Sequence, residues 1–194
     1  VWCGYRRPAF LQPDDSRFEE ISSLYYKELE KLYGKANYYS MDPFHEGGST
    51  DGVNLDAVGK AVMKAMKKAN PKAVWVIQAW QANPRPELIR NLETGDLLIL
   101  DLTSECRPQW GDPESEWYRK DGYGKHNWVY CMLLNYGANV GLHGKMDNVI
   151  DNYYLAKENL RARATLKGVG MTPEGIENNP VMYELLMELP WRPE

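Results

Sequence analysis

The feature that most constrains the fold is an alternation of short apolar segments with amphipathic stretches along the whole chain. The apolar segments have the composition of buried β-strands, and in the stretches between them apolar residues recur at helical spacing. Strands that are apolar along their whole length and alternate with helices predict a parallel sheet covered on both faces. The predicted strands are residues 36–41, 73–78, 96–102, 127–134 and 165–171.

Helix start and stop signals place the intervening helices. The first is expected to begin after Pro13 with Asp14 or Asp15 as its cap, and to end at Gly34. Asp147 is expected to cap one continuous helix that runs to about Arg163. Residues 107–125 are polar and aromatic and contain prolines and glycines, which predicts a long surface loop. The other predicted helices are residues 53–69, 86–92 and 180–189.

The number of strand units limits the architecture. A complete (β/α)8 barrel typically takes about 250 residues, and this chain has 194 residues and five strand units rather than eight. The sequence contains no internal repeats, low-complexity tracts or linkers. We therefore expect a single α/β domain over residues 1–194 that is a partial TIM-type barrel, an open sheet or a piece of something larger.

Composition and charge exclude several classes of function. The net charge is −4 and the pI is about 5.5, so nothing predicts nucleic acid as a partner. The apolar runs are far shorter than a bilayer requires, so we expect no membrane insertion. Three widely spaced cysteines without a C-x-x-C pair predict neither a zinc site nor a disulfide framework. The chain begins without a methionine or a secretory signal, so its start is expected to be cut.

Polar and aromatic residues follow each predicted strand, at the end where parallel α/β folds bind ligands. Two carboxylic acids that face each other beside an aromatic platform form the layout that glycoside hydrolysis requires. A partly desolvated carboxyl group at such an edge can have a raised pKa and act as a general acid. The candidates are Asp42, His45 and Glu46, then Trp80, Glu105, Asn135 and Glu174.

Simpler roles for these residues stay open at this point. Asp42 could open a turn, Glu46 could be a solvated carboxylate, and Trp80 could belong to the core. Asp42, His45, Glu46 and Glu105 could also hold a divalent metal in a metal-dependent hydrolase, although no second histidine lies near them. A third possibility is a carbohydrate-binding or structural module without catalysis.

Longer motifs over residues 9–194 resemble the catalytic barrel of the α-N-acetylglucosaminidases, a glycoside hydrolase family that includes the lysosomal enzyme degrading heparan sulfate. The order and spacing of the motifs make the resemblance specific. The matching segments are Asp42-x-Phe44-x-Glu46, Ala73-Val74-Trp75-x-x-Gln78-x-Trp80, Leu98-x-Leu100-Asp101-Leu102-x-x-Glu105-x-x-Pro108, Trp128-x-x-Cys131-Met132-Leu133, Asn135-x-Gly137-x-Asn139-x-Gly141-Leu142 and Gly168-x-Gly170-Met171-x-Pro173-Glu174-Gly175-Ile176.

The resemblance implies a function and a set of site residues. Glu46 would be the general acid/base and Glu174 the nucleophile of a retaining double displacement. Trp80 would line the sugar pocket beside His45, which stands where the family commonly has an amide. The expected reaction removes terminal, non-reducing α-linked N-acetylglucosamine from a glycan, without a metal or an organic cofactor.

The resemblance also implies a larger context for the chain. Residues 1–194 would form the later part of the barrel, partnered by the earlier barrel strands and a helical C-terminal domain of a longer enzyme. Whether such a piece is active alone is a separate question. The expected setting is lysosomal, secreted or periplasmic.

Overall fold

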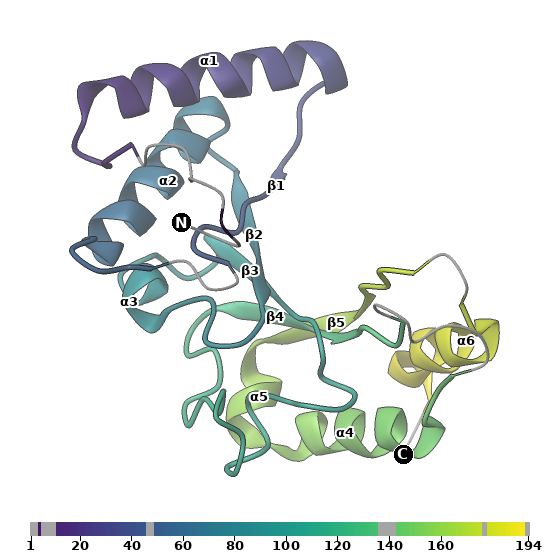
Figure 1. The fold of residues 1–194 in the computed structure, drawn as a ribbon. Helices are drawn as coiled ribbons and strands as arrows, with labels where there is room; N and C mark the ends of the chain where they lie inside the picture. The colour runs from purple at the N-terminus through teal and green to yellow at the C-terminus, as the bar shows by residue number, and fades with distance from the viewer. Residues whose placement is uncertain (1–3, 5–10, 46–48, 136–142, 176–177, 193–194) are drawn as a thin grey trace.

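The computed structural model describes residues 4, 11–45, 49–135, 143–175 and 178–192. Five parallel strands form one sheet in the order β1-β2-β3-β4-β5, so each strand pairs with its neighbours in the sequence (Figure 1). The strands are β1 (Tyr38–Ser40), β2 (Val74–Ala79), β3 (Leu97–Asp101), β4 (Asn127–Met132) and β5 (Leu166–Met171). The helices are α1 (Ser16–Tyr33), α2 (Leu55–Ala69), α3 (Pro86–Ile89), α4 (Met146–Glu158), α5 (Leu160–Thr165) and α6 (Pro180–Glu188), followed by the short 3-10 helix η1 (Leu189–Trp191).

The sequential strand order is the arrangement of a TIM-type barrel, in which each strand lies beside the next one along the chain. The registers confirm the parallel prediction: Trp75 of β2 pairs with Leu97 of β3, and Ile99 pairs with Trp128 of β4. Five such strands form the partial barrel that the sequence predicted.

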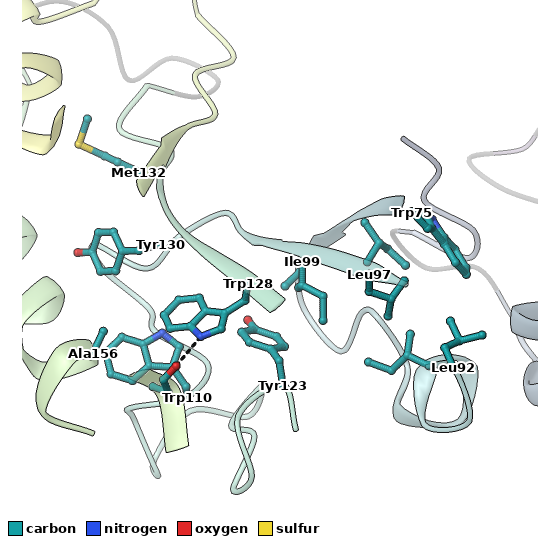
Figure 2. Packing of buried hydrophobic residues seen from close by; sticks show 14 of the residues in the cluster. Trp75, Leu92, Leu97, Ile99, Trp110, Tyr123, Trp128, Tyr130, Met132 and Ala156 are labelled. Atoms are coloured by element: carbon teal, nitrogen blue, oxygen red, sulfur yellow. Dashed lines mark hydrogen bonds between the residues drawn. The ribbon is translucent and has the colours of Figure 1, made fainter. Parts of the chain in front are cut away.

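The core lies on one face of this sheet. Strand residues such as Ile77 and Leu97 are fully buried there against the helices. Trp128 is central, since its ring packs 5.6 Å from the rings of both Trp110 and Tyr123, and its indole N–H donates to the Ala162 carbonyl at 2.8 Å (Figure 2). These contacts join β4 to α5 and to the loop that precedes β4.

The opposite face corrects one prediction. Both faces were expected to be covered, but in the described part of the chain the alternate residues Val74, Val76, Leu98 and Leu100 are only half-buried. The helices cover only the other face, and an open sheet has no second layer to bury these side chains. Apolar side chains in these positions are what the interior of a closed barrel requires.

Helix α1 forms as predicted but buries little. Asp15 caps it by accepting from the Arg17 N–H at 2.9 Å, and Gly34 ends it at a φ of 81°. Apolar residues recur along it at helical spacing, yet Ile21 is 54% exposed and Leu32 is 69% exposed. The helix packs on α2 and leaves a hollow of about 530 Å3 against β1.

Several other boundaries differ from the predictions: the helix predicted over 86–92 covers only 86–89 and the strand predicted over 36–41 only 38–40. Two further differences have causes in the backbone and caps. The expected helix from Asp147 to Arg163 is two helices, because Asn159 is extended and its side chain accepts from the N–H groups of Arg161 and Ala162. Asn159 therefore ends α4 and caps α5, while Asp147 lies in the first turn of α4 and does not cap it. The strand predicted over 127–134 ends earlier, at Met132. Residues 133–134 lie outside β4, and Leu134 has a positive φ of 54°, which is incompatible with a strand.

The predicted surface loop, residues 107–125, contains part of the core. Gln109, Trp110 and Tyr123 are buried in it, although most of its neighbouring residues are exposed. Arg119 donates to the Gln109 side chain at 2.7 Å and to the Pro84 carbonyl at 2.8 Å. The loop is thus fastened to the segment that follows β2.

The packing of α2 on α3 predicts a large effect of a small substitution. Gly59 lies so close to α3 that an added Cβ would be 2.0 Å from the Leu88 carbonyl oxygen. Gly59→Ala would otherwise favour the helix, but relief of this overlap is expected to cost about 1–3 kcal/mol of unfolding free energy. Urea unfolding followed by circular dichroism measures the change.

The matched control for this prediction is Gly111→Ala. An added Cβ there would meet Pro108 and Leu155 at 3.6 Å and 3.7 Å, which is ordinary van der Waals contact. We expect that control to change the unfolding free energy by about 0.5 kcal/mol or less. Equal stability of the two variants would mean that α2 and α3 are not in this close contact.

Candidate active site

Hydrogen bonds join the strand-end loops along the carboxyl edge of the sheet. After β1, the Asp42 carboxylate accepts from the backbone N–H of Gln78 on β2 at 2.6 Å. After β5, the Glu174 N–H donates to the Asn135 carbonyl, which follows β4, at 2.9 Å. The residues predicted from the strand ends therefore lie on one edge, as far as the structure describes them.

The loop after β1 begins the site. Burial raises the pKa of the half-buried Asp42, and the hydrogen bond from Gln78 opposes this rise. The Nδ1 atom of His45 is buried and makes no hydrogen bond within the described ranges. Glu46, the predicted acid/base, lies outside the described residues. The structure therefore gives no distance between its carboxyl group and that of Glu174.

Trp80 follows β2 and is half-buried at the sheet edge. Its ring centroid lies 5.5 Å from that of Trp117, with the planes tilted by 50°, and the Arg107 guanidinium lies 5.6 Å from the Trp117 ring centroid. The Trp80 indole nitrogen is buried and has no hydrogen-bond partner among the described residues. An amphipathic ring with an unused N–H suits contact with a sugar.

Trp117 was missed by the sequence analysis. It lies in the loop of residues 107–125, which was interpreted only as surface. The available signal was the presence of Trp110 and Trp117 in this polar and aromatic loop, but their sequence positions do not show which of them reaches Trp80. The structure separates them: Trp110 packs on Trp128 in the core, and Trp117 packs on Trp80.

Glu105, the acidic residue after β3, accepts hydrogen bonds from the backbone. It is 8% exposed, and its Oε1 atom accepts from the N–H groups of both Leu133 and Leu134 at 3.0 Å. Burial raises the pKa of Glu105, while these two donors lower it. This carboxylate therefore lies beneath the edge of the sheet and does not open into it.

A second buried acid, Asp101, ends β3 and was not a predicted site residue. It is completely buried on the same sheet face as Leu97 and Ile99, the face covered by helices and loops. Burial raises its pKa to about 7, against the opposing effects of the Tyr123 hydroxyl and the positive charge of Arg119. It lies in the core layer and not among the strand-end residues.

Glu174 lies on the loop after β5 and its side chain is exposed to solvent. Asn135, by contrast, is 3% exposed, and the loop carrying Glu174 packs closely upon it. An added Cβ on Gly175 would lie 2.4 Å from the Asn135 Oδ1 atom, so only glycine fits there. The backbone of this loop is thereby fixed while the Glu174 carboxylate remains accessible.

The described residues provide no ready metal site. No three histidine, cysteine, aspartate or glutamate side chains within the described ranges are grouped so that they could hold an ion. The metal-dependent alternative used Asp42, His45, Glu46 and Glu105; the three of these that the structure describes do not form such a group, and Glu46 lies outside the described residues. None of the helices in these ranges has both the length and the apolar character needed to span a bilayer.

The fold and the edge residues define a class of protein: a TIM-type barrel segment with an acidic and aromatic site at the carboxyl ends of its strands. Residues 1–193 match the family model of the α-N-acetylglucosaminidase TIM-barrel domain. The chain therefore belongs to the α-N-acetylglucosaminidase family, whose members are glycosidases.

Individual relatives agree with this assignment. The chain is 33% identical to human α-N-acetylglucosaminidase over 201 residues, covering 98% of this chain and 26% of the human protein. It also matches a family 89 glycoside hydrolase from Clostridium perfringens in complex with PUGNAc, with a TM-score of 0.76 and 30% identity over 98% of this chain and 21% of that one. Another structure of the Clostridium enzyme, with two glutamates replaced by glutamine, holds its substrate GlcNAc-α-1,4-galactose; its TM-score is 0.76 and its identity 29%.

The chain spans about a quarter of the human relative and about a fifth of the Clostridium enzyme. The match lies within the barrel domain of the family, in agreement with five strands where a full barrel has eight.

Proposed function

We propose that this chain supplies both catalytic carboxyl groups of a retaining α-N-acetylglucosaminidase. Glu46 acts as general acid/base and Glu174 as nucleophile on a terminal, non-reducing α-linked N-acetylglucosamine. The observation that carries the proposal is the continuous edge from Asp42 to Asn135 and Glu174, which brings the loops after the strands to one side of the sheet.

The first step forms a glycosyl-enzyme. Glu174, ionised and exposed, attacks the anomeric carbon, and the bond to the leaving oxygen breaks as Glu46 donates its proton to that oxygen. In the second step Glu46 removes a proton from water, which attacks the anomeric carbon and releases Glu174. Each step inverts the anomeric centre, so the product retains the α configuration.

The chemistry of the substrate supports an enzymatic nucleophile. In an α-linked N-acetylglucosamine the 2-acetamido group and the leaving group are cis, so the acetamido oxygen cannot attack from the face opposite the leaving group. Substrate assistance, which replaces the nucleophile in some other glycosidase families, is therefore not open to this reaction. A retaining reaction then needs a carboxylate from the protein, whereas an inverting one would use water directly. Glu174 is exposed on the predicted edge.

The sugar contacts belong to the loops after β1 and β2. Trp80 stacks on the apolar face of the ring, with Trp117 behind it. The Nδ1 of His45, which lacks a partner among the described residues, hydrogen-bonds to a sugar hydroxyl or acetamido group. The carboxyl groups of Glu46 and Glu174 are expected to be about 5–5.5 Å apart, the separation typical of retaining enzymes.

The test uses the protein that carries residues 1–194 and 4-nitrophenyl N-acetyl-α-D-glucosaminide, with the β-anomer as the control substrate. We expect hydrolysis of the α-anomer alone, with α-N-acetylglucosamine as the first product detected by proton NMR. If β-N-acetylglucosamine were the first product detected, the reaction would invert the anomeric centre and retention would be refuted. Inhibition by EDTA that added metal reverses would favour the metal-dependent alternative, and binding without hydrolysis would favour a carbohydrate-binding module.

A further inference from the structure

Glu105 is a buried acid for which the proposed chemistry has no use. Its Oε1 atom accepts two consecutive backbone N–H groups, those of Leu133 and Leu134, directly after β4. Hydrogen bonds from N–H groups to a carboxylate are stronger than those between neutral groups. Glu105 thus binds the end of β4 from the loop after β3.

The bound segment has an unfavourable backbone conformation. Leu134 has a φ of 54°, in the left-handed region that a leucine side chain disfavours. Such a conformation persists only where the surroundings enforce it. Both hydrogen bonds to Glu105 come from N–H groups directly before the Leu134 Cα, those of Leu133 and Leu134, so the carboxylate anchors the start of this turn.

The same turn determines the position of Asn135. The Asn135 N–H donates to the Leu133 carbonyl at 2.6 Å, and the Asn135 carbonyl accepts from the Glu174 N–H at 2.9 Å. The loop cannot shift toward Asn135 either, because Gly175 already lies in close contact with its side chain. A path of hydrogen bonds therefore runs from Glu105 through the turn to Glu174.

We propose that Glu105 is a positioning residue for Glu174: its carboxylate holds the turn after β4, and Asn135 transmits that geometry to the loop carrying the nucleophile. This inference rests on the role of Glu174 in the proposed function. Glu105 touches no substrate, and its effect on the reaction comes only through the placement of the Glu174 backbone. The link from Glu105 to Glu174 is a property of the folded chain and can be measured without substrate.

The first measurement is hydrogen–deuterium exchange in the protein that carries residues 1–194, followed by mass spectrometry. Glu105→Ala removes both acceptor bonds, so amide exchange is expected to accelerate in a peptide spanning 132–136 and also in one spanning 171–175. In the second peptide Pro173 has no N–H, which leaves few amides besides that of Glu174. Glu105→Gln keeps an acceptor oxygen for both donors and is expected to restore slow exchange.

The second measurement is steady-state kinetics on the aryl α-N-acetylglucosaminide. Displacement of a reacting group by about 1 Å costs up to about 100-fold in rate, so Glu105→Ala is expected to lower kcat by about 10–100-fold while KM changes less than about threefold. Glu105→Gln is expected to recover most of kcat. Val62→Ala, which removes buried side-chain atoms from α2, controls for a general loss of stability.

Two results would overturn the inference. One is faster exchange in the 132–136 peptide without any change in the 171–175 peptide, since Glu105 would then act only locally. The other is a pattern of exchange and kinetics in Glu105→Ala that Val62→Ala reproduces. Absence of hydrolysis in the unmodified protein would instead refute the proposed function, and exchange in the 171–175 peptide would still decide whether Glu105 positions Glu174.

Discussion

Glu174→Ala is expected to abolish turnover of every α-N-acetylglucosaminide, whatever its leaving group. Loss of a nucleophile removes the first covalent step, and in a well-studied protease it lowers kcat by about 10⁶-fold; we expect a decrease of about 10⁴-fold or more here. The Glu174 side chain is exposed, and its loop is held through the backbone N–H to Asn135. Thermal unfolding is therefore expected to stay close to that of the unmodified protein.

Rescue of Glu174→Ala by azide tests whether Glu174 is the nucleophile, which a loss of activity alone does not show. In Glu174→Ala the anion can occupy the position of the missing carboxylate and attack from the same face. The expected product is the β-glycosyl azide, with restored cleavage of activated aryl substrates. The matched control is Glu184→Ala, which removes an exposed glutamate from α6 and is expected to leave kcat unchanged. Rates within a few-fold of the unmodified protein would show that Glu174 is not the nucleophile.

Glu46→Gln is expected to affect substrates according to their leaving groups. Glutamine preserves the shape of the side chain but cannot donate a proton to the departing oxygen, and general acid catalysis contributes about 10²–10⁴-fold. The loss in kcat/KM is therefore expected to reach about 10³-fold for alkyl and disaccharide substrates, and to be small for dinitrophenyl glycosides, which depart unassisted. A plot of log kcat/KM against the pKa of the leaving phenol measures this dependence.

The second step gives an independent check on Glu46. Without its base, water attacks the glycosyl-enzyme slowly, so a dinitrophenyl substrate is expected to show a burst of phenol followed by a slow steady state. Azide needs no base and is expected to give the α-glycosyl azide, the opposite anomer to that from Glu174→Ala. An equal loss for all leaving groups would contradict the acid/base role. Glu87→Gln, which alters an exposed side chain in α3, is the matched control.

The two azide products make the assignments of Glu46 and Glu174 separable. A simple loss of activity in both variants could follow from misfolding or from lost binding. Opposite anomers require that one carboxyl group lies on the attacking face and the other on the leaving-group face. This result would also establish that both residues, 128 positions apart in the chain, meet at one anomeric carbon.

Several features of the fold could be predicted because they depend on local patterns. The apolar strand segments and the helix between Asp15 and Gly34 follow from side-chain periodicity and from capping chemistry. Parallel pairing follows from the alternation of strands and helices, and the strand count explains why the barrel is partial. The positions of Asp42, Trp80 and Glu174 directly after strands could also be predicted, while their roles in a site stay predictions.

Other features depended on contacts between distant segments and could not be predicted. The division of one expected helix at Asn159 depends on a side-chain cap that competes with a continuous helix. The pairing of Trp117 with Trp80 depends on the path of a loop. The exposure of the apolar stripe of α1 depends on what lies beside it, because periodicity shows only which residues share a face and not whether another element covers that face.

By itself, the sequence determined the class of fold and the family, because strand periodicity and motif order are properties of the chain. Only the tertiary structure distinguished the two acids after β3 and β5. Glu105 and Glu174 have the same side chain and the same place after a strand, but one is buried under two backbone donors and the other is exposed. The physical reason is that burial and hydrogen bonding, which decide whether a carboxylate holds the backbone or meets a substrate, are set by neighbouring loops distant in the sequence.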